Sequence, residues 1–135
     1  MDISRADLII ICPIIWVECW SMLFPMELND KYCYKRIYIN AGTRTSYQYH
    51  ENKLETNYII DGKAEVWLEN DEGTVEKTMM KKDDSFTVIP PRKHRVIALT
   101  DLILQEVSTP EVDDVIRIED DSGRSGGRID SEHSE

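Results

Sequence analysis

The feature that most limits what this chain can fold into is a regular alternation of short β-rich runs and turn signals. Between residues 31 and 107 the turn signals recur at intervals of roughly 8–12 residues, the spacing typical of all-β sandwiches and barrels. None of the runs shows a sustained helical period. The sequence therefore predicts an all-β fold and disfavours a parallel α/β fold. The predicted strands span residues 32–40, 45–50, 55–61, 63–70, 75–80, 85–90, 94–100 and 102–109.

Two of these strands meet at Asp61-Gly62, the strongest short hairpin signal in the sequence. Asp-Gly suits a type I′ turn, whose twist matches that of paired strands. We therefore predict that residues 55–61 and 63–70 pair directly with each other. Residues 75–80 follow a further turn and are predicted to form an edge strand.

Composition and charge exclude some partners. At 135 residues the chain is expected to form one domain. Its 26 acidic residues outnumber 16 Lys and Arg, and the net charge of −10 argues against a nucleic-acid partner. Three cysteines without CxxC spacing predict neither a disulfide framework nor a zinc knuckle. A reducing, cytoplasmic location is the resulting expectation.

The two ends of the chain differ from the middle. Residues 8–17 form an apolar run that acidic residues flank, and this run is too short to span a bilayer, so no membrane partner is expected. We predict an N-terminal apolar segment (residues 1–28) that adds a strand, a barrel domain (29–118) and an acidic, disordered tail (119–135). In a predicted homodimer, residues 8–17 add a strand to the partner or are covered by it.

Metal-ligand side chains gather in the middle of the chain. Gln48 and His50 are two residues apart and so share one face of a strand, and Glu55 opens the next strand. These three ligand-type side chains could therefore converge on one point.

Structural roles for the same residues remain open at this point. Gln48 and His50 could be interior polar residues that satisfy each other and Tyr58. Glu55 could be a solvated charge at a strand end, and His94 could belong to an exposed basic turn.

The spacing of these residues resembles the cupin family, which are small β-barrels of the jelly-roll, or double-stranded β-helix, type. The first cupin motif, G-X5-H-X-H-X3–4-E-X6-G, is matched here by Gly42, His50, Glu55 and Gly62, with Gln48 in the place of the first histidine. A second motif ends in a histidine after a proline turn, as His94 does after Pro90-Pro91.

A first motif with glutamine at this position resembles that of one branch of the family, the cupin domain of type II mannose-6-phosphate isomerases. Residues 116–124, IRIEDDSGR, resemble the closing segment of that domain, and the likeness covers about residues 30–124. The resemblance implies that Gln48, His50, Glu55 and His94 hold a divalent metal, with zinc the first choice and Mn, Fe or Co as alternatives. It also implies that Arg117 and Arg124 bind the phosphate of a sugar phosphate.

The function that the resemblance implies is the interconversion of mannose 6-phosphate and fructose 6-phosphate. A second hypothesis is a non-catalytic cupin that binds a sugar phosphate or nucleotide sugar and serves a separate nucleotidyltransferase. A third is an inert barrel used for dimerisation, because cupins host many functions. No general base is identified from the sequence.

Overall fold

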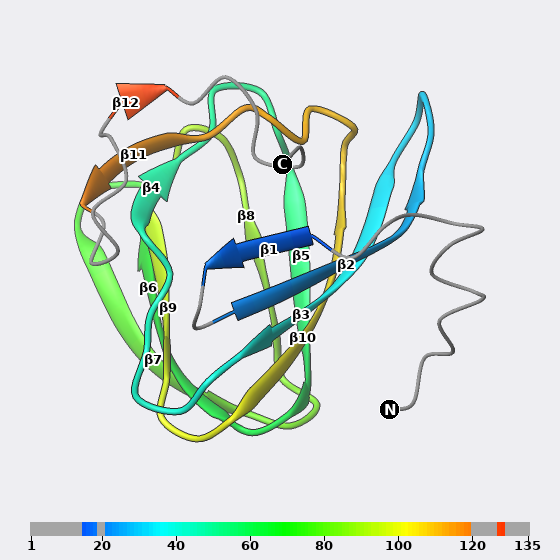
Figure 1. The fold of residues 1–135 in the computed structure, drawn as a ribbon. Helices are drawn as coiled ribbons and strands as arrows, with labels where there is room; N and C mark the ends of the chain where they lie inside the picture. The colour runs from blue at the N-terminus through cyan, green and yellow to red at the C-terminus, as the bar shows by residue number, and fades with distance from the viewer. Residues whose placement is uncertain (1–14, 19–20, 120–126, 129–135) are drawn as a thin grey trace.

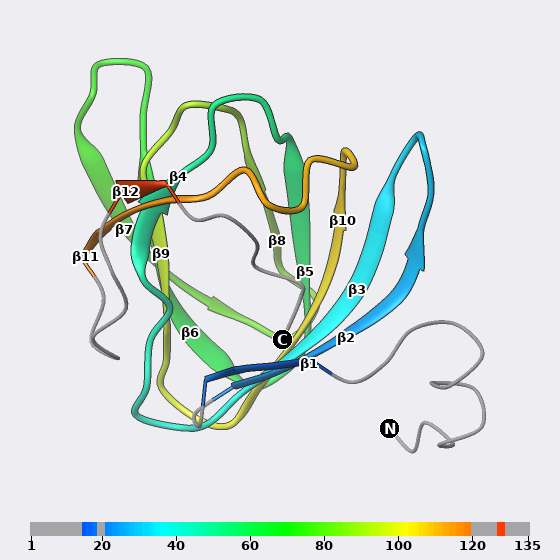
Figure 2. The same ribbon diagram turned by 45° about the horizontal axis from the view of Figure 1, so that its top comes forward.

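The computed structural model describes residues 15–18, 21–119 and 127–128, and these residues form two six-stranded antiparallel sheets. The sheets face each other across the interior of the molecule (Figures 1 and 2). The predicted all-β class is therefore confirmed. The strands are β1 (Ile15–Glu18), β2 (Ser21–Leu28), β3 (Cys33–Ile39), β4 (Tyr47–Tyr49), β5 (Glu55–Asp61), β6 (Lys63–Glu69), β7 (Val75–Lys81), β8 (Ser85–Val88), β9 (His94–Ala98), β10 (Leu102–Ser108), β11 (Ile116–Glu119) and β12 (Gly127–Arg128).

In each sheet, most pairs of adjacent strands are not consecutive in the sequence. The first sheet has the order β1-β2-β3-β10-β5-β8, and the second has the order β12-β11-β4-β9-β6-β7. β7 lies at the edge of the second sheet, as the sequence predicts. This interleaved order places β4 and β9 opposite β5, and the three strands together carry the candidate site.

The apolar core lies between the sheets because inward and outward side chains alternate along each strand. In β10, Leu102 and Leu104 are buried, whereas Ile103 and Gln105 between and after them are half-exposed. The same alternation in the other strands produces one continuous cluster. Its buried members are Ile39, Ile59, Ala64, Val66, Phe86, Val88, Val96, Ala98, Leu102 and Leu104.

The predicted hairpin across Asp61-Gly62 is wrong. β5 pairs with β10 and β8 in the first sheet, whereas β6 pairs with β7 and β9 in the second. The turn therefore carries the chain from one sheet to the other. Gly62 has a φ of +98°, and the position of a Cβ there would be 2.2 Å from the carbonyl oxygen of Asp101. The glycine is needed for this close crossing of two chain segments.

The N-terminal segment pairs within its own chain where the structure describes it. β2 pairs with β3, and β1 pairs with β2, so both extend the first sheet. Residues 8–14 of the apolar run lie outside the described residues, and the homodimer stays a prediction. Near the other end, β12 pairs with β11, and the rest of the acidic tail lies outside the described residues. No helix among the described residues is long and apolar enough to cross a membrane.

Candidate metal centre

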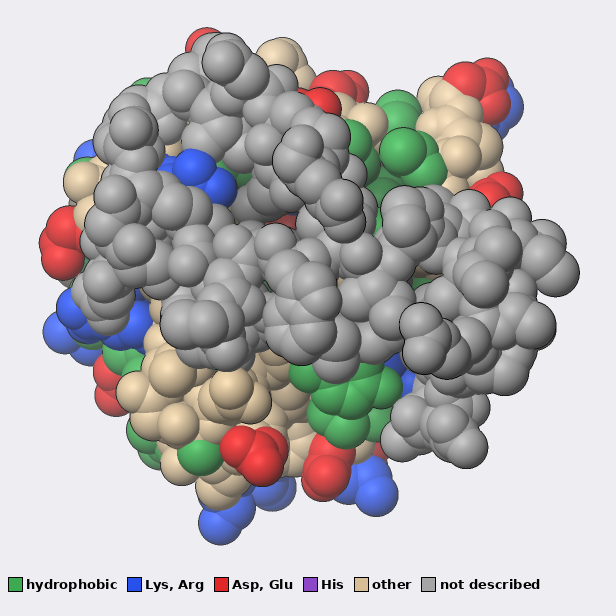
Figure 3. All heavy atoms as spheres, in the orientation of Figure 1, with side chains coloured by type: hydrophobic (Ala, Val, Ile, Leu, Met, Phe, Trp, Pro, Cys, Tyr) green, Lys and Arg blue, Asp and Glu red, His purple; other side chains and the backbone are tan. Residues whose placement is uncertain are grey.

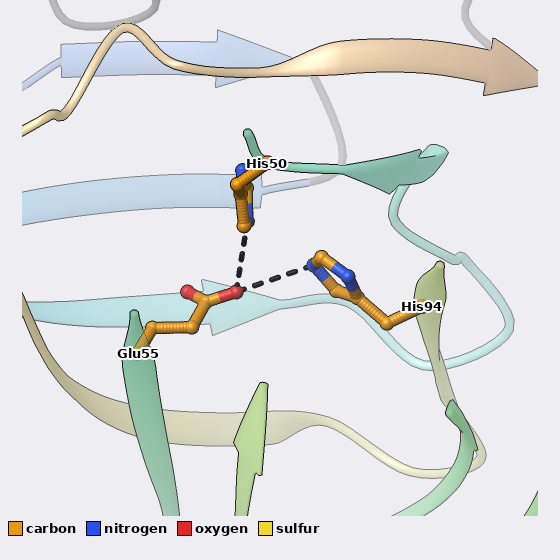
Figure 4. Close-up of side chains that lie close together, drawn as sticks. All are labelled: His50, Glu55 and His94. Atoms are coloured by element: carbon orange, nitrogen blue, oxygen red, sulfur yellow. Dashed lines mark hydrogen bonds and ion pairs between the residues drawn. The ribbon is translucent and has the colours of Figure 1, made fainter. Parts of the chain in front are cut away.

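Three predicted ligands, His50, Glu55 and His94, meet between the two sheets. His50 directly follows β4 and His94 begins β9 in the second sheet, whereas Glu55 begins β5 in the first. One carboxylate oxygen, Oε1 of Glu55, lies 3.0 Å from Nε2 of His50 and 3.2 Å from Nε2 of His94 (Figure 4). The three ligand atoms all lie within 4.8 Å of one another. The structure thus brings three of the four predicted ligands together, and their part in holding a metal stays a prediction.

All three side chains are shielded from solvent. The exposed fractions are 0% for His50, 4% for Glu55 and 5% for His94. On the face of the molecule that Figure 3 shows, no histidine is seen among the side chains that are coloured by type. Glu55 is therefore not a solvated strand-end charge, and His94 is not part of an exposed basic turn.

The other ring nitrogen of each histidine is fixed by a backbone carbonyl. Nδ1 of His50 lies 2.6 Å from the carbonyl oxygen of Asp114, and Nδ1 of His94 lies 3.1 Å from that of Arg92. Because a carbonyl only accepts hydrogen bonds, we assign a proton to each Nδ1. In the neutral imidazoles, both Nε2 atoms then present lone pairs toward the carboxylate. Three acceptors converging on one point are satisfied by a cation, and this tautomer is the usual one for a metal-binding histidine.

Asp114 also holds the loop that follows His50. Its carboxylate accepts hydrogen bonds from the backbone N–H groups of Glu51, Asn52 and Lys53, at 3.1, 2.6 and 3.0 Å. Asp114 could not be selected from the sequence, since it lies more than sixty residues from the loop that it holds. Its role follows from the fold, which brings the segment before β11 against the end of β4.

The charge state of Glu55 suits a metal ligand. Burial by itself raises the pKa of this carboxyl, but the nearby Lys53 ammonium outweighs that effect, together with the Nε2–H groups of His50 and His94 whenever both nitrogens of these rings are protonated. The pKa is held well below its usual range. Glu55 is therefore ionised across the neutral range and can offer a negative oxygen to a cation.

A second buried ionic group adjoins these ligands, and it was not predicted from the sequence. Lys35 of β3 and Glu106 of β10 are paired in register, and Nζ of Lys35 lies 3.3 Å from Oε2 of Glu106. Nζ of Lys53 lies 3.7 Å from Oε2 of Glu55 and 3.8 Å from Oε2 of Glu106. The available signal was a charged residue at an inward position of an apolar strand, between Leu104 and Ser108 for Glu106.

We expect Glu106→Gln to stabilise the metal-free protein at high pH but not at low pH. Burial, followed by the nearby charge of Glu55, raises the pKa of Glu106 from 4.5 to about 7, against the opposing effect of Lys35 and Lys53. A raised folded-state pKa contributes stability below about pH 4.5 that is lost as the pH rises through about 7. Because glutamine imitates the protonated form, the variant should gain up to about 3 kcal/mol relative to wild type between pH 5 and pH 8.5.

Urea unfolding of both proteins in EDTA at the two pH values measures this effect. Glu76→Gln, at an exposed position of β7, is the matched control and should show no such pH dependence. An equal stability difference between Glu106→Gln and wild type at pH 5 and pH 8.5 would contradict the prediction.

Gln48, the fourth predicted ligand, is not among the three side chains that meet at Glu55. Gln48 lies opposite His94 in the pairing of β4 with β9, and its Oε1 accepts a hydrogen bond from Ser46 Oγ at 2.5 Å. Its part as a metal ligand stays a prediction. Tyr58 does not satisfy Gln48 or His50, because its hydroxyl donates to Asp83 on the outside of the barrel.

Only one of the two predicted phosphate ligands, Arg117, lies among the residues that the structure describes. Arg117 is buried and pairs in register with Gln48 across β11 and β4, so it lies on the same strand face as that residue. Arg124 lies outside the described residues. Phosphate binding by either arginine stays a prediction.

Comparison with known proteins identifies the family. A model of the cupin domain family matches residues 35–108. That stretch is more than half of the chain, and the protein therefore belongs to the cupin family. The jelly-roll barrel that the sequence predicts is thus confirmed. No curated protein sequence matches the chain significantly.

Several solved structures share this fold. KdgF from Halomonas sp. is 20% identical with a TM-score of 0.65, and the match covers 72% of this chain and 86% of that one. The capsular polysaccharide assembling protein CapF from Staphylococcus aureus is 13% identical with a TM-score of 0.68, over 80% of this chain and 32% of CapF. A candidate sugar phosphate isomerase from Acidithiobacillus ferrooxidans is 18% identical with a TM-score of 0.51, over 58% of this chain and 50% of that one. At these identities the likeness shows a shared fold.

The donor set fits a divalent metal of the kind that cupins commonly bind. Two imidazole nitrogens and one ionised carboxylate oxygen suit a divalent transition metal, and no thiolate is among the described ligand atoms. Three protein ligands leave further positions for substrate oxygens or water, which is typical of catalytic rather than structural metal sites.

Proposed function

We propose that this protein is a metal-dependent sugar-phosphate isomerase that interconverts mannose 6-phosphate and fructose 6-phosphate. The observation that carries the proposal is the convergence of His50, Glu55 and His94 on one point inside a cupin barrel. The sequence likeness of Gln48 and of residues 116–124 to type II mannose-6-phosphate isomerases directs the proposal to this substrate. The fold likeness to a candidate sugar phosphate isomerase is compatible with it.

Each part of the site would have a separate task. A divalent cation, with zinc the first choice, would supply positive charge to neighbouring oxygens of the sugar, where aldose–ketose isomerisation develops negative charge. His50, Glu55 and His94 would hold that cation, and Gln48 would complete the set from the facing strand position. Arg117, on the strand face that carries Gln48, would bind the phosphate.

The test measures metal content and turnover on the same samples. Purified wild-type protein is expected to contain close to one divalent metal per chain and to convert fructose 6-phosphate to mannose 6-phosphate in a coupled assay. His50→Ala should lose both, because the imidazole that bonds Asp114 and faces Glu55 is removed. His133→Ala, which changes the histidine that neither cupin motif includes, is the matched control and should retain both.

Two outcomes would overturn the proposal. Metal that is lost in His50→Ala, without turnover in the wild-type protein, would favour the cupin that only binds a sugar phosphate or nucleotide sugar. The absence of metal from every sample, even after incubation with excess Zn²⁺, would favour the barrel without a metal function.

A further inference from the structure

His50 differs from the other two candidate ligands in how its backbone is held. Glu55 lies in β5, which pairs with both β8 and β10, and His94 lies in β9, which pairs with both β4 and β6. The sheets therefore fix the backbone of these two residues. His50 lies one residue beyond the end of β4, outside the strands, and the loop that follows it crosses to the other sheet. Contacts from another segment have to set its position.

The segment between β10 and β11 supplies these contacts. The backbone carbonyl of Asp114 lies 2.6 Å from Nδ1 of His50, and its carboxylate accepts the backbone N–H groups of residues 51–53 at distances between 2.6 and 3.1 Å. At the far end of the loop, the N–H of Leu54 donates to Oγ1 of Thr109 at 3.0 Å, and the N–H of Thr109 donates to the carbonyl of Leu54 at 2.9 Å. The segment thus holds the loop at both of its ends.

Asp114 is itself fixed in place. Its side chain is 8% exposed, and its own N–H donates to the carbonyl of Glu111 at 3.2 Å. The next residue, Val115, is fully buried, and β11 begins at Ile116, which is paired with Tyr49 of β4. Asp114 is therefore continuous with a buried residue and with a strand of the second sheet.

We infer that Asp114 is a positioning residue of the metal centre. Its carbonyl orients the imidazole of His50, and its carboxylate fixes the loop so that Nε2 of His50 faces Glu55. This inference rests on the proposed function because it concerns the same metal centre, and it adds to that function a residue that acts through a ligand. Hydrogen-bond partners that orient metal ligands typically change metal affinity by about 10- to 100-fold.

Asp114→Asn tests the carboxylate with little change in size. One carboxylate oxygen accepts the N–H of Glu51, and the other accepts those of Asn52 and Lys53. Asparagine has one acceptor oxygen and an NH₂ group that only donates. Either orientation of the amide therefore places its NH₂ group against a backbone N–H, and the loop should shift. We expect the affinity for Co²⁺, followed by the visible absorption of the bound cobalt, to fall by about 10- to 100-fold.

Glu111→Gln is the matched control. It removes the same charge from the same segment at an exposed position, where the side chain does not face the loop. Its affinity for Co²⁺ should equal that of the wild-type protein. An equal loss in both variants would mean that net charge, rather than the contacts of Asp114, sets the affinity.

A second readout separates the positioning of His50 from an effect on overall stability. An imidazole that binds Co²⁺ through Nε2 keeps its proton on Nδ1, and the cobalt shifts the NMR signal of that proton far from the others. The wild-type protein should show two such signals in water, because Nδ1 of both His50 and His94 is bonded to a backbone carbonyl and should exchange slowly with solvent. Asp114→Asn should lose one signal and retain that of His94. A residue that acts only on stability would not affect one signal selectively.

The wild-type protein provides a test that does not depend on the folding of a variant. Because coupling is reciprocal, a metal that binds more tightly when Asp114 holds the loop must also strengthen the bonds between Asp114 and the loop. Zn²⁺ should therefore slow hydrogen exchange of the backbone N–H groups of residues 51–53 by at least about tenfold. The N–H groups of Glu72 and Thr74, which donate to Asn70 in a separate turn, are the control and should change little.

The outcomes separate this inference from the proposed function. Unchanged Co²⁺ affinity and two retained signals in Asp114→Asn, or exchange at residues 51–53 that Zn²⁺ does not slow, would overturn the inference and leave the metal-dependent isomerase intact. Failure of the wild-type protein to bind either metal would overturn both. Because none of these readouts requires turnover, a metal-bound protein without isomerase activity would overturn only the proposed function.

Discussion

His94→Ala is expected to lower the affinity of the protein for divalent metal by more than about 100-fold. Loss of residues that merely orient a metal ligand typically lowers affinity by about 10- to 100-fold, and loss of a ligand should exceed that. His94 is buried, its Nδ1 contacts the carbonyl of Arg92, and its Nε2 faces Glu55. Alanine removes one of the three acceptors that converge at the centre. Equilibrium dialysis against Zn²⁺ with elemental analysis of the protein measures the change.

The same variant should lose the stabilisation that metal gives the fold. A metal that binds only the folded protein raises the free energy of unfolding by about 2.7 kcal/mol at 100 times its dissociation constant. Thermal unfolding with Zn²⁺ and with EDTA should therefore differ for the wild type and coincide for His94→Ala. Lys93→Ala changes the neighbouring residue, a half-exposed partner of Glu69, and should retain the difference. Undiminished zinc binding by His94→Ala would place the metal site elsewhere.

The candidate ligands of this centre could be proposed from the sequence because most of the relevant information is local. His50 and Glu55 lie within one short segment, and the strand period fixes the face on which Gln48 and His50 point. His94 required the family spacing, since forty-four residues separate it from His50. The structure then supplies the physical reason for their meeting, which is that β4 and β9 are paired and face the start of β5.

The groups around the ligands could not be predicted in the same way. Lys35 and Glu106 become partners only because β3 pairs with β10, and Asp114 reaches His50 across sixty-four residues of sequence. A lysine or a glutamate within a strand is ordinarily on the solvent face, and the alternation that places Glu106 inward does not identify Lys35 as its partner. The charge balance of the site is therefore a property of the fold.

The strand boundaries were largely predictable, whereas one of the turns was not. β5 begins and ends where the alternation of apolar and polar residues predicts, at Glu55 and Asp61. Asp-Gly indicates a tight turn with positive φ, and Gly62 does adopt positive φ. The signal does not say whether the flanking strands pair with each other. In this barrel β5 and β6 pair with other strands, and the turn connects the first sheet to the second.

Gly62→Ala is therefore expected to destabilise the protein by about 2–6 kcal/mol. A φ of +98° is unfavourable for any residue with a Cβ, and strain of this kind costs about 1–3 kcal/mol. In addition, the new methyl group would lie 2.2 Å from the carbonyl oxygen of Asp101 and 3.1 Å from Cα of Leu102. These are backbone atoms next to a buried core strand, and moving them costs a further 1–3 kcal/mol, roughly, as overpacking does. Urea unfolding of the metal-free protein measures the loss.

Gly73→Ala separates the two contributions. Gly73 also has a positive φ, of +80°, but no atom lies within 4 Å of the position that its Cβ would take. That variant should lose only the conformational term of about 1–2 kcal/mol. The difference between the two variants then reports the close approach of the 61–63 turn to Asp101, where both chain segments pass from one sheet to the other. Equal destabilisation by both substitutions would mean that the chain can move at Gly62, and that the passage between the sheets is looser than the structure indicates.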